Sequence, residues 1–300
     1  MRFNVQRPVA SRDGPSWWQE QRRAWAHHTI SDLLSSIRKA LTSLVEEGPK
    51  TAAVKTYYGT RALYQRFWFR KSYGGSLEDR FTAMYKNRLW GGDKQDESFS
   101  GPGSTLEYTK VLRSELPKLF RQFAIRSVFD APCGDFKWMQ HVIRECPGIE
   151  YIGADIIAPI VEANTAQHAN ERIRFFHADL TQAEFPKADL MICRDCLFHL
   201  SYQDIKRVLD NFVASGIPFL LTSTHLDAVT NRDIWNGDFR LIDLFSTPFN
   251  FPKDEYYRIE DWVPGFPPRE MCLWSRDQVV SGLRASSWTS SQVRHAACGR

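Results

Sequence analysis

Short apolar runs and helical periods alternate through the second half of the chain. The apolar runs, rich in β-branched and aromatic residues and typical of buried strands, stand at 127–129, 151–155, 173–180, 188–193 and 217–224. Amphipathic stretches at 158–170 and 202–214 have the period of helices. Because parallel strands need a crossover connection, usually a helix, this alternation predicts an α/β fold with a doubly wound, mostly parallel sheet. Two further runs, at 256–262 and 271–274, complete a predicted Rossmann-like sheet of seven strands.

The residues before this core have a different pattern. Between Ser16 and Glu47, apolar residues recur every three or four positions, with basic residues between them, which predicts a helix. We interpret residues 1–75 as a basic amphipathic helical arm. Three interpretations stay open for its helix: it packs on its own domain, it lies on anionic lipid as a peripheral membrane contact, or it docks on a partner helix. Aromatic and basic residues also interleave at 57–71, but nucleic-acid binding is the less favoured interpretation.

A tight turn follows the first run of the core. It reads Asp130-Ala131-Pro132-Cys133-Gly134-Asp135-Phe136, and the second run ends at Asp155, 21 residues after Gly134. Dinucleotide sites need glycines through such a turn, so that backbone N–H groups can hold a pyrophosphate. Here Pro132 has no N–H, and two carboxylates would repel phosphate. A ligand with a sulfonium and an ammonium group and no phosphate, such as S-adenosylmethionine, fits better.

This turn resembles motif I of the class I S-adenosylmethionine-dependent methyltransferases. The strings SGPGSTLEYT, VFDAPCGDF and ICRDCLFHLS are similar to those of bacterial members, and the similarity covers about residues 76–276. The resemblance implies that Asp155 binds the ribose hydroxyls and that Asp179, after the third run, binds the adenine amino group. The other cofactor-binding candidates are Asp130, Ala131, Pro132, Gly134, Asp135, Ile156, Leu180 and Arg194.

A helical lid is predicted over residues 76–125, before the core. Ser76 is a plausible N-cap for a helix that ends near Trp90, and a second helix runs from Thr105 to about Phe123. Between them lies the turn Gly101-Pro102-Gly103-Ser104. We expect its N–H groups to point outward and to suit a carboxylate such as that of methionine, with Gly103, Ser104 and a covering Trp90 as further cofactor-binding candidates. The alternative is a connecting loop capped by Ser104.

Candidate catalytic residues follow the fourth and fifth runs. Run 188–193 delivers Arg194, Asp195 and His199 to the carboxyl edge of the sheet, where α/β sites form. Methyl transfer to a hydroxyl needs a base, and an imidazole titrates near neutrality. We predict His199 as the base, Asp195 as its partner or rival, and His225 as a second candidate. The alternatives are a packed His199, an Arg194–Asp195 salt bridge and a simple loop histidine at 225.

Residues 226–254 form a long aromatic loop with little periodicity, and such loops in compact domains are usually functional. We predict that it forms the acceptor wall, with Arg240 available for an anionic group and Trp235 and Phe249 as further substrate-binding candidates. The segment after Cys193 lacks the Asn/Asp-Pro-Pro-Tyr/Phe signature of enzymes that methylate nitrogen. We therefore favour an oxygen nucleophile on a small molecule or a glycan.

Composition and charge narrow the class of protein. The 300 residues are 43% hydrophobic and 25% charged, as in soluble globular proteins. The net charge of +4 is uneven, because residues 1–75 hold 13 Lys/Arg and 5 Asp/Glu and so carry +8. We expect no membrane-spanning helix, no secretion signal and a cytoplasmic location with reduced cysteines. The Cys193/Cys196 spacing is interpreted as packing, and no metal ligands are assigned.

The sequence therefore predicts an S-adenosylmethionine-dependent O-methyltransferase with a core at 126–285 and a flexible tail at 286–300. Two other classes of function stay open. One is an RNA or protein methyltransferase that docks through the basic arm, and the other is a noncatalytic S-adenosylmethionine-binding interaction module.

Overall fold

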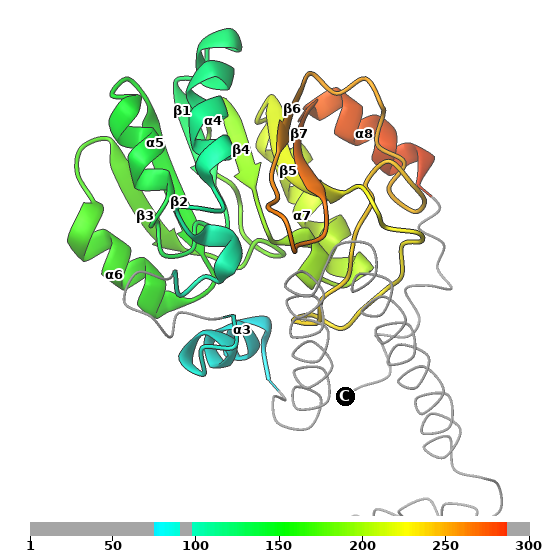
Figure 1. The fold of residues 1–300 in the computed structure, drawn as a ribbon, viewed down its shortest axis with the longest axis horizontal. Helices are drawn as coiled ribbons and strands as arrows, with labels where there is room; N and C mark the ends of the chain where they lie inside the picture. The colour runs from blue at the N-terminus through cyan, green and yellow to red at the C-terminus, as the bar shows by residue number, and fades with distance from the viewer. Residues whose placement is uncertain (1–74, 91–97, 287–300) are drawn as a thin grey trace, which may run out of the picture. The chain divides into compact units, whose positions relative to one another are not determined.

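The computed structural model describes residues 75–90 and 98–286. Its centre is a seven-stranded sheet with the order β3-β2-β1-β4-β5-β7-β6 (Figure 1). All pairings among β1 to β5 are parallel, whereas β7 is antiparallel to both β5 and β6. The predicted mostly parallel sheet is therefore confirmed. The strands are β1 (Ser127–Asp130), β2 (Glu150–Asp155), β3 (Ile173–His177), β4 (Leu190–Cys193), β5 (Phe219–His225), β6 (Tyr257–Glu260) and β7 (Arg269–Ser275).

Helices cover both faces of the sheet. Neighbouring residues of β1 point to opposite faces: Val128 packs with α4 and α5, whereas Phe129 packs with α7 and α8. Each face has its own hydrophobic core, which is the arrangement expected of a doubly wound sheet. The helices of the core are α4 (Lys110–Gln122), α5 (Met139–Glu145), α6 (Ala158–His168), α7 (Tyr202–Ser215), α8 (Arg276–Ala285) and the 3₁₀ helix η2 (Leu197–His199).

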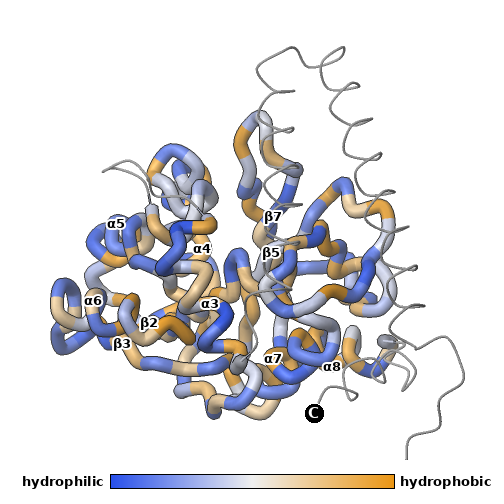
Figure 2. The backbone as a smooth tube through the Cα atoms, turned by 90° about the horizontal axis from the view of Figure 1, so that it is seen from below, coloured by the Kyte–Doolittle hydropathy of each residue, from blue (hydrophilic) through white to orange (hydrophobic). Residues whose placement is uncertain are grey.

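Helix α3 (Leu77–Lys86) lies across the carboxyl edge of the sheet, where Figures 1 and 2 place it. The predicted N-cap is confirmed, because Ser76 and Asp79 form a reciprocal capping box. Two contacts hold the helix there. Glu78 pairs with His177 of β3 at 3.1 Å, and Arg80 Nη1 donates to the carbonyl oxygen of Asn236 at 2.7 Å. Helix α3 thus spans from the β3 side of the sheet to the long loop after β5.

Some predicted boundaries differ from the structure. The second lid helix begins at Lys110 and not at Thr105, since residues 102–104 form a 3₁₀ turn, η1 (Pro102–Ser104), and Thr105 caps it through bonds to Pro102 O. Helix α8 was not expected as an element, although Ser275 and Gln278 form a capping box at its start. The predicted arm at 1–75 and tail at 286–300 lie outside the described residues, apart from their innermost positions. Within residues 75–90 and 98–286, no helix is long and apolar enough to cross a bilayer.

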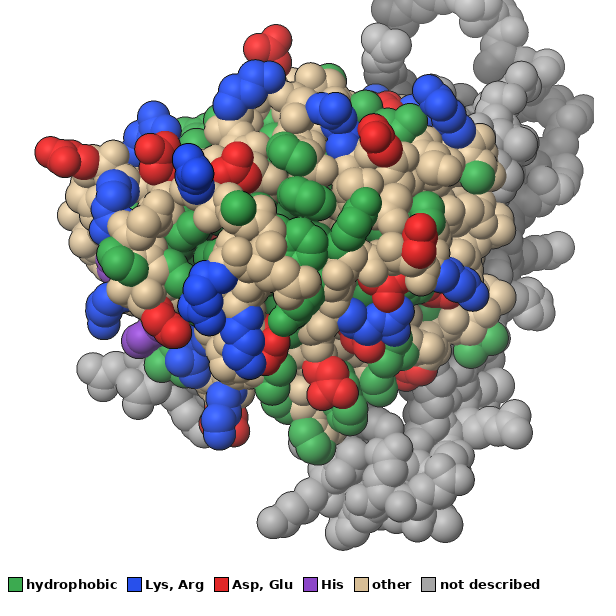
Figure 3. Space-filling model, turned by 90° about the horizontal axis from the view of Figure 1, so that it is seen from above, with side chains coloured by type: hydrophobic (Ala, Val, Ile, Leu, Met, Phe, Trp, Pro, Cys, Tyr) green, Lys and Arg blue, Asp and Glu red, His purple; other side chains and the backbone are tan. Residues whose placement is uncertain are grey.

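The amino edge of the sheet carries an aromatic cluster. The rings of Phe123, Phe219, Tyr256 and Tyr257 contact one another at centroid distances of 5.6 to 6.3 Å. Figure 3 views the molecule from above and shows hydrophobic side chains gathered on this face. This cluster lies at the edge opposite to α3, so it is separate from the residues predicted to bind a cofactor.

Candidate functional site

Asp155 ends β2 and faces the turn after β1. Its Oδ2 accepts the Gly134 N–H at 3.1 Å and its Oδ1 accepts the Ile157 N–H at 3.0 Å. Burial raises the pKa of Asp155 to about 6, and these backbone hydrogen bonds oppose the rise. A carboxylate has about four acceptor positions, so both oxygens can still accept from another donor. Asp155 therefore fits the role of a hydroxyl-binding acid.

Asp130 ends β1 and is fully buried beside Tyr151, whose phenol donates to Asp130 Oδ2 at 2.6 Å. Burial raises the pKa of Asp130 to about 7, while the hydrogen bond from Tyr151 opposes this rise. The rings of Tyr151, Phe136 and Phe175 pack against one another. The hydrogen bond from Tyr151 thus fixes the position of the Asp130 carboxyl group.

The motif I turn is covered by residues 98–100 of the lid. Asp135 Oδ2 accepts from the hydroxyl of Ser98 at 2.6 Å and from the N–H of Phe99 at 3.0 Å, and the Asp135 N–H donates to Ser100 Oγ at 2.9 Å. A Cβ added to Gly134 would lie 2.6 Å from Ser100 Oγ. The structure therefore gives Asp135 and Gly134 a role that the sequence did not predict, which is to seat the lid on the turn.

The other predicted cofactor residues lie around this turn. Asp179 follows β3 and accepts from Thr181 and Gln182, so both of its oxygens already have donors. The carbonyl oxygen of Ile156 accepts a hydrogen bond from His177 Nε2 at 2.8 Å. Ala131, which precedes Pro132, and Leu180, which follows Asp179, are buried in the core cluster. These positions surround the ends of β1, β2 and β3, and their contact with a ligand stays a prediction.

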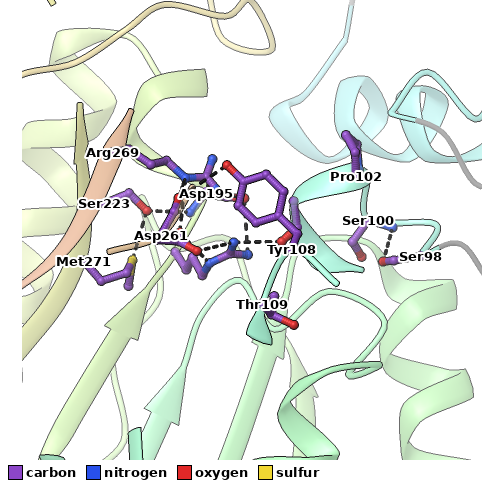
Figure 4. Close-up of polar contacts among 12 residues, drawn as sticks. Ser98, Ser100, Pro102, Tyr108, Thr109, Asp195, Ser223, Asp261, Arg269 and Met271 are labelled. Carbon is purple, nitrogen blue, oxygen red and sulfur yellow. Dashed lines mark hydrogen bonds and ion pairs between the residues drawn. The ribbon is translucent and has the colours of Figure 1, made fainter. Parts of the chain in front are cut away.

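A network of two arginines and two aspartates lies at the ends of β4, β6 and β7 (Figure 4). Arg194 donates to both oxygens of Asp261 at 2.9 Å, and Arg269 Nε donates to Asp261 Oδ2 at 3.1 Å. Asp195 forms ion pairs with Arg269 at 3.0 Å and with Arg194 at 3.3 Å. Both guanidinium groups lie over the ring of Tyr108, at 5.8 and 4.9 Å. The four charges neutralise one another, with Arg194, Arg269 and Asp261 buried and Asp195 partly exposed.

Asp195 is the strained member of this network. Its φ of 55° is unusual for a residue with a side chain and is typical of functional sites. Burial opposes ionisation, but the guanidinium groups of Arg194 and Arg269 outweigh it and hold the pKa of Asp195 below its usual value. A carboxylate with a lowered pKa is a weak base. The alternative given above for Arg194 and Asp195, an internal salt bridge, is therefore what the structure shows, and the predicted use of Asp195 as a rival base is not favoured.

The lid turn is attached to the same network. Arg194 Nη2 donates to the carbonyl oxygen of Gly103 at 2.7 Å, and a Cβ on Gly103 would lie 2.7 Å from Asp195 Oδ2. The N–H groups of Ser104 and Thr105 bond to Gly101 and Pro102 within the turn. The expectation that the N–H groups of this turn point outward is therefore wrong for Ser104 and Thr105. The turn instead approaches the arginine network through its backbone.

Trp90 lies above this turn. Its ring is 6.1 Å from the ring of Phe81 on α3, and its Cβ is 3.2 Å from the position of a Cβ added to Gly101. Gly101 has a φ of 104°, so the close approach and the backbone conformation both require glycine there. Trp90 thus packs against the lid turn, while the predicted contact of Trp90 with a cofactor stays a prediction.

His199 ends η2 and has a defined tautomer. Its Nδ1 lies 2.9 Å from the carbonyl oxygen of Asp238, and because a carbonyl oxygen can only accept, Nδ1 must carry the proton. The Nε2 atom therefore has the lone pair. Burial lowers the pKa of His199, with the bond to Asp238 opposing this effect, so the neutral imidazole is the stable form at neutral pH. His199 is suited to accept a proton at Nε2.

His225 ends β5 and is arranged in the opposite way. Its Nδ1 accepts the N–H of Ile242 at 3.2 Å, so its proton is on Nε2. Burial, followed by the charge of Arg269, lowers the pKa of His225 to about 3. This imidazole can donate a hydrogen bond but has no free lone pair for a proton. The prediction of His225 as a second candidate base is therefore not supported by its geometry.

The loop after β5 places the predicted substrate residues in different surroundings. Trp235 is 58% exposed, and the neighbouring Phe239 is 41% exposed and packs against His199 at 5.9 Å. Phe249 is 1% exposed and packs against Tyr202, so it lies in the core and not on an acceptor wall. Arg240 is 2% exposed and donates to the carbonyl oxygen of Leu200 at 2.6 Å. Phe249 and Arg240 are thus buried in this structure, and their contact with an acceptor stays a prediction.

Comparisons with known proteins bear on this geometry. A family model described as a methyltransferase domain matches residues 128–215. Uncharacterized methyltransferases of Mycobacterium tuberculosis and Mycobacterium bovis are each 28% identical over 99 residues, which is 32% of this chain and 47% of theirs. The chain thus spans about half the length of the curated relatives it matches.

The core carries a class I methyltransferase domain. This family was recognised from the residues of the motif I turn, and the recognition is confirmed by the match and by the strand order. Methyltransferases of this class use S-adenosylmethionine, so the predicted class of enzyme and its cofactor are confirmed for the domain.

Solved structures with a similar fold include human N-acetylserotonin methyltransferase in complex with SAM. That protein is 14% identical to this chain with a TM-score of 0.48, and the match covers 75% of this chain and 70% of the methyltransferase chain. Magnesium protoporphyrin IX methyltransferase from Synechocystis with bound SAH has 13% identity and a TM-score of 0.47, with coverage of 67% of this chain and 98% of that one.

Three residues of the arginine network were not predicted from the sequence. Asp261 and Arg269 flank the loop between β6 and β7, and Tyr108 precedes α4, so all three are far from Arg194 in the chain. One signal was available. Arg269 and Glu270 open a run that is otherwise apolar, and charges at the start of a buried strand need a partner. The identity of that partner depends on the antiparallel insertion of β7, which periodicity does not reveal.

Proposed function

We propose that this chain transfers the methyl group of S-adenosylmethionine to a hydroxyl oxygen of a small-molecule or glycan acceptor, with His199 as the general base. The observation that carries this proposal is the hydrogen bond from His199 Nδ1 to Asp238 O, which leaves the Nε2 lone pair available. An oxygen nucleophile must lose its proton during the transfer, and a neutral imidazole is the side chain best suited to take it near pH 7.

The residues around the motif I turn fit the cofactor. Asp155 retains acceptor capacity for ribose hydroxyls, and Asp130 and Asp155 supply negative charge for a ligand that carries a sulfonium and an ammonium group. Bound there, the cofactor supplies an activated methyl group whose leaving group needs no protonation. The protein then has only to orient the acceptor, exclude water and take up one proton.

The tautomers of His199 and His225 decide which of them can take the proton during methyl transfer. In the proposed reaction the bound cofactor would supply the methyl group and leave as S-adenosylhomocysteine, and His199 Nε2 would take the proton that the acceptor hydroxyl loses. The resulting imidazolium is stabilised by the carbonyl of Asp238 and by the nearby charge of Asp195, both of which raise the pKa of His199. His225 stays neutral, and its Nε2–H is a hydrogen-bond donor.

The rings next to His199 support an acceptor with an apolar or sugar face. Phe239 is 41% exposed and lies 5.9 Å from His199, and Trp235 in the same loop is 58% exposed. Exposed aromatic rings beside a polar group are typical of sites that bind a flat ring or the C–H face of a sugar while they orient one hydroxyl.

Labelled cofactor tests this function directly. The protein is incubated with methyl-labelled S-adenosylmethionine and fractions of a cell lysate, and the labelled products are separated and identified. We expect the label on an oxygen of a small molecule or glycan. Label on a nitrogen, on RNA or on protein would contradict the proposed acceptor, and cofactor binding without turnover in any fraction would favour the noncatalytic interaction module.

A further inference from the structure

The loop at 237–240 holds the turn at 197–200 by its backbone. The Gly237 N–H donates to the His199 carbonyl at 2.8 Å, and the Arg240 N–H donates to the Phe198 carbonyl at 3.3 Å. In the reverse direction, His199 Nδ1 donates to the Asp238 carbonyl at 2.9 Å. The imidazole and the carbonyl that selects its tautomer therefore belong to two segments that are tied together on both sides of His199.

The guanidinium of Arg240 adds two bonds to the same turn. Its Nη1 donates to the carbonyl oxygen of Leu200 at 2.6 Å, and its Nη2 lies 3.5 Å from the carbonyl oxygen of Leu197. The group stacks on the ring of Tyr202, 5.2 Å from the centroid. With its backbone N–H, Arg240 thus contacts the carbonyls of three of the four residues in the turn.

Arg240 is a buried cation held by dipoles. It is 2% exposed, and no acid within residues 75–90 and 98–286 forms an ion pair with it. Burial lowers its pKa to about 10, so it is still protonated at neutral pH. The last carbonyls of a helix carry partial negative charge and attract cations. The carbonyls of Leu197 and Leu200, at the two ends of η2, are therefore the hydrogen-bond partners of this charge, which the carboxylate of Asp233 also favours.

We propose that Arg240 is a positioning residue that fixes the tautomer and orientation of His199 and does not touch the acceptor. By holding the carbonyls on both sides of His199, Arg240 prevents the turn from rotating relative to Asp238. The Asp238 carbonyl then stays in line with Nδ1–H, and the lone pair stays on Nε2. The catalytic consequence of this role rests on the proposed function, whereas its effect on the tautomer does not.

Lysine cannot reproduce this arrangement. An ammonium group is a compact charge that can reach one of the two side-chain carbonyls, whereas the planar guanidinium spans both and stacks on Tyr202. Arg240→Lys keeps the positive charge but loses the planar group that contacts both carbonyls, and Arg240→Gln loses the charge and the planar guanidinium. We expect kcat to fall on the order of 10-fold in Arg240→Lys and 100-fold in Arg240→Gln, because small misplacements of a catalytic group have effects of this size.

The test reads the His199 ring directly. Isotope-labelled protein is examined by NMR correlations that distinguish protonated from unprotonated imidazole nitrogens, with His199→Asn used to assign the signal. We expect a single Nδ1–H tautomer in the wild type and a mixture of tautomers in Arg240→Lys. The pH dependence of kcat should shift in the same variant while KM stays unchanged. Val279→Ala serves as the control, since Val279 is a buried residue of α8 outside this contact and its loss should lower Tm alone.

Two outcomes would overturn the inference. One is a folded Arg240→Lys protein whose His199 tautomer and pH profile match the wild type. The other is a large rise in KM at unchanged kcat, which would show that Arg240 binds an anionic group of the acceptor. If no methyl transfer is found at all, the proposed function fails, and the tautomer measurement still decides the role of Arg240.

Discussion

Replacement of Asp155 by Asn separates the stability of the site from its affinity for the cofactor. Asp155 accepts one backbone N–H on each oxygen. An Asn amide can accept only one of them, and its NH₂ group faces the other. A buried N–H without a partner costs about 1–3 kcal/mol. The substitution should therefore destabilise the fold through hydrogen bonding.

The charge of Asp155 acts in the opposite direction. Its folded pKa of about 6 is above the unfolded value of roughly 3.9, so the folded state binds its proton more tightly. Stability from this group is present below pH 4 and is lost as pH rises toward 6. The loss is about 3 kcal/mol, at 1.36 kcal/mol for each unit of pKa. Asn removes this loss, so at pH 7.5 the two effects nearly cancel.

Cofactor affinity has no such compensation. A hydrogen bond to a charged group contributes roughly 1.5–3 kcal/mol, so loss of one carboxylate acceptor should weaken binding of S-adenosylhomocysteine by about 10- to 100-fold. Urea unfolding at pH 4.5 and 7.5 and isothermal titration check the two parts. We expect Asp155→Asn to unfold within about 2 kcal/mol of the wild type at pH 7.5. An unchanged affinity for S-adenosylhomocysteine would refute the assignment of Asp155 to the cofactor site. A loss of affinity that the unfolded fraction of the variant fully explains would refute it as well.

Two further predictions concern the arginine network. Gly103→Ala places a Cβ 2.7 Å from Asp195 Oδ2, so it should destabilise the fold by about 1–3 kcal/mol and weaken cofactor binding. In the control Gly148→Ala the added Cβ has nothing within 4 Å, so stability should change by less than about 0.5 kcal/mol. Equal effects of the two substitutions in calorimetry would contradict the close approach of the lid turn. Asp261→Asn removes one of the two carboxylates that neutralise the buried guanidinium groups of Arg194 and Arg269, so it should lower the free energy of unfolding in urea by about 3–5 kcal/mol. The control Asp210→Asn breaks an exposed pair with Lys206 and should lower it by less than about 1 kcal/mol. A small effect of Asp261→Asn would show that Asp195 alone neutralises both arginines.

The cofactor side of the site could be predicted from sequence because its residues are close in the chain. Asp130, Gly134 and Asp155 fall within one βαβ unit, so the strand pattern alone brings them together. The use of Asp135 was not predictable in the same way. Its partners Ser98 and Ser100 belong to the lid, more than 30 residues earlier, and a carboxylate in motif I looks the same whether it faces a ligand or another segment.

The acceptor side was predicted less well, because it depends on contacts between distant segments. Sequence patterning placed His199 and His225 at the same edge but could not assign their tautomers, which are set by Asp238 O and by the Ile242 N–H. Arg240 looked like a group free to bind an anion. Its burial follows from the docking of the loop on η2, which no periodic signal in residues 226–254 indicates.

The central claim is tested most directly by the rate of methyl transfer in His199→Asn. Asn can keep the hydrogen bond to Asp238 O, because its amide nitrogen can occupy the place of Nδ1, but it has no base at the position of Nε2. We predict that kcat falls by about 10²- to 10⁴-fold, the usual contribution of a general base, while the affinity for S-adenosylhomocysteine is unchanged. A variant that transfers methyl groups at the wild-type rate would contradict the account.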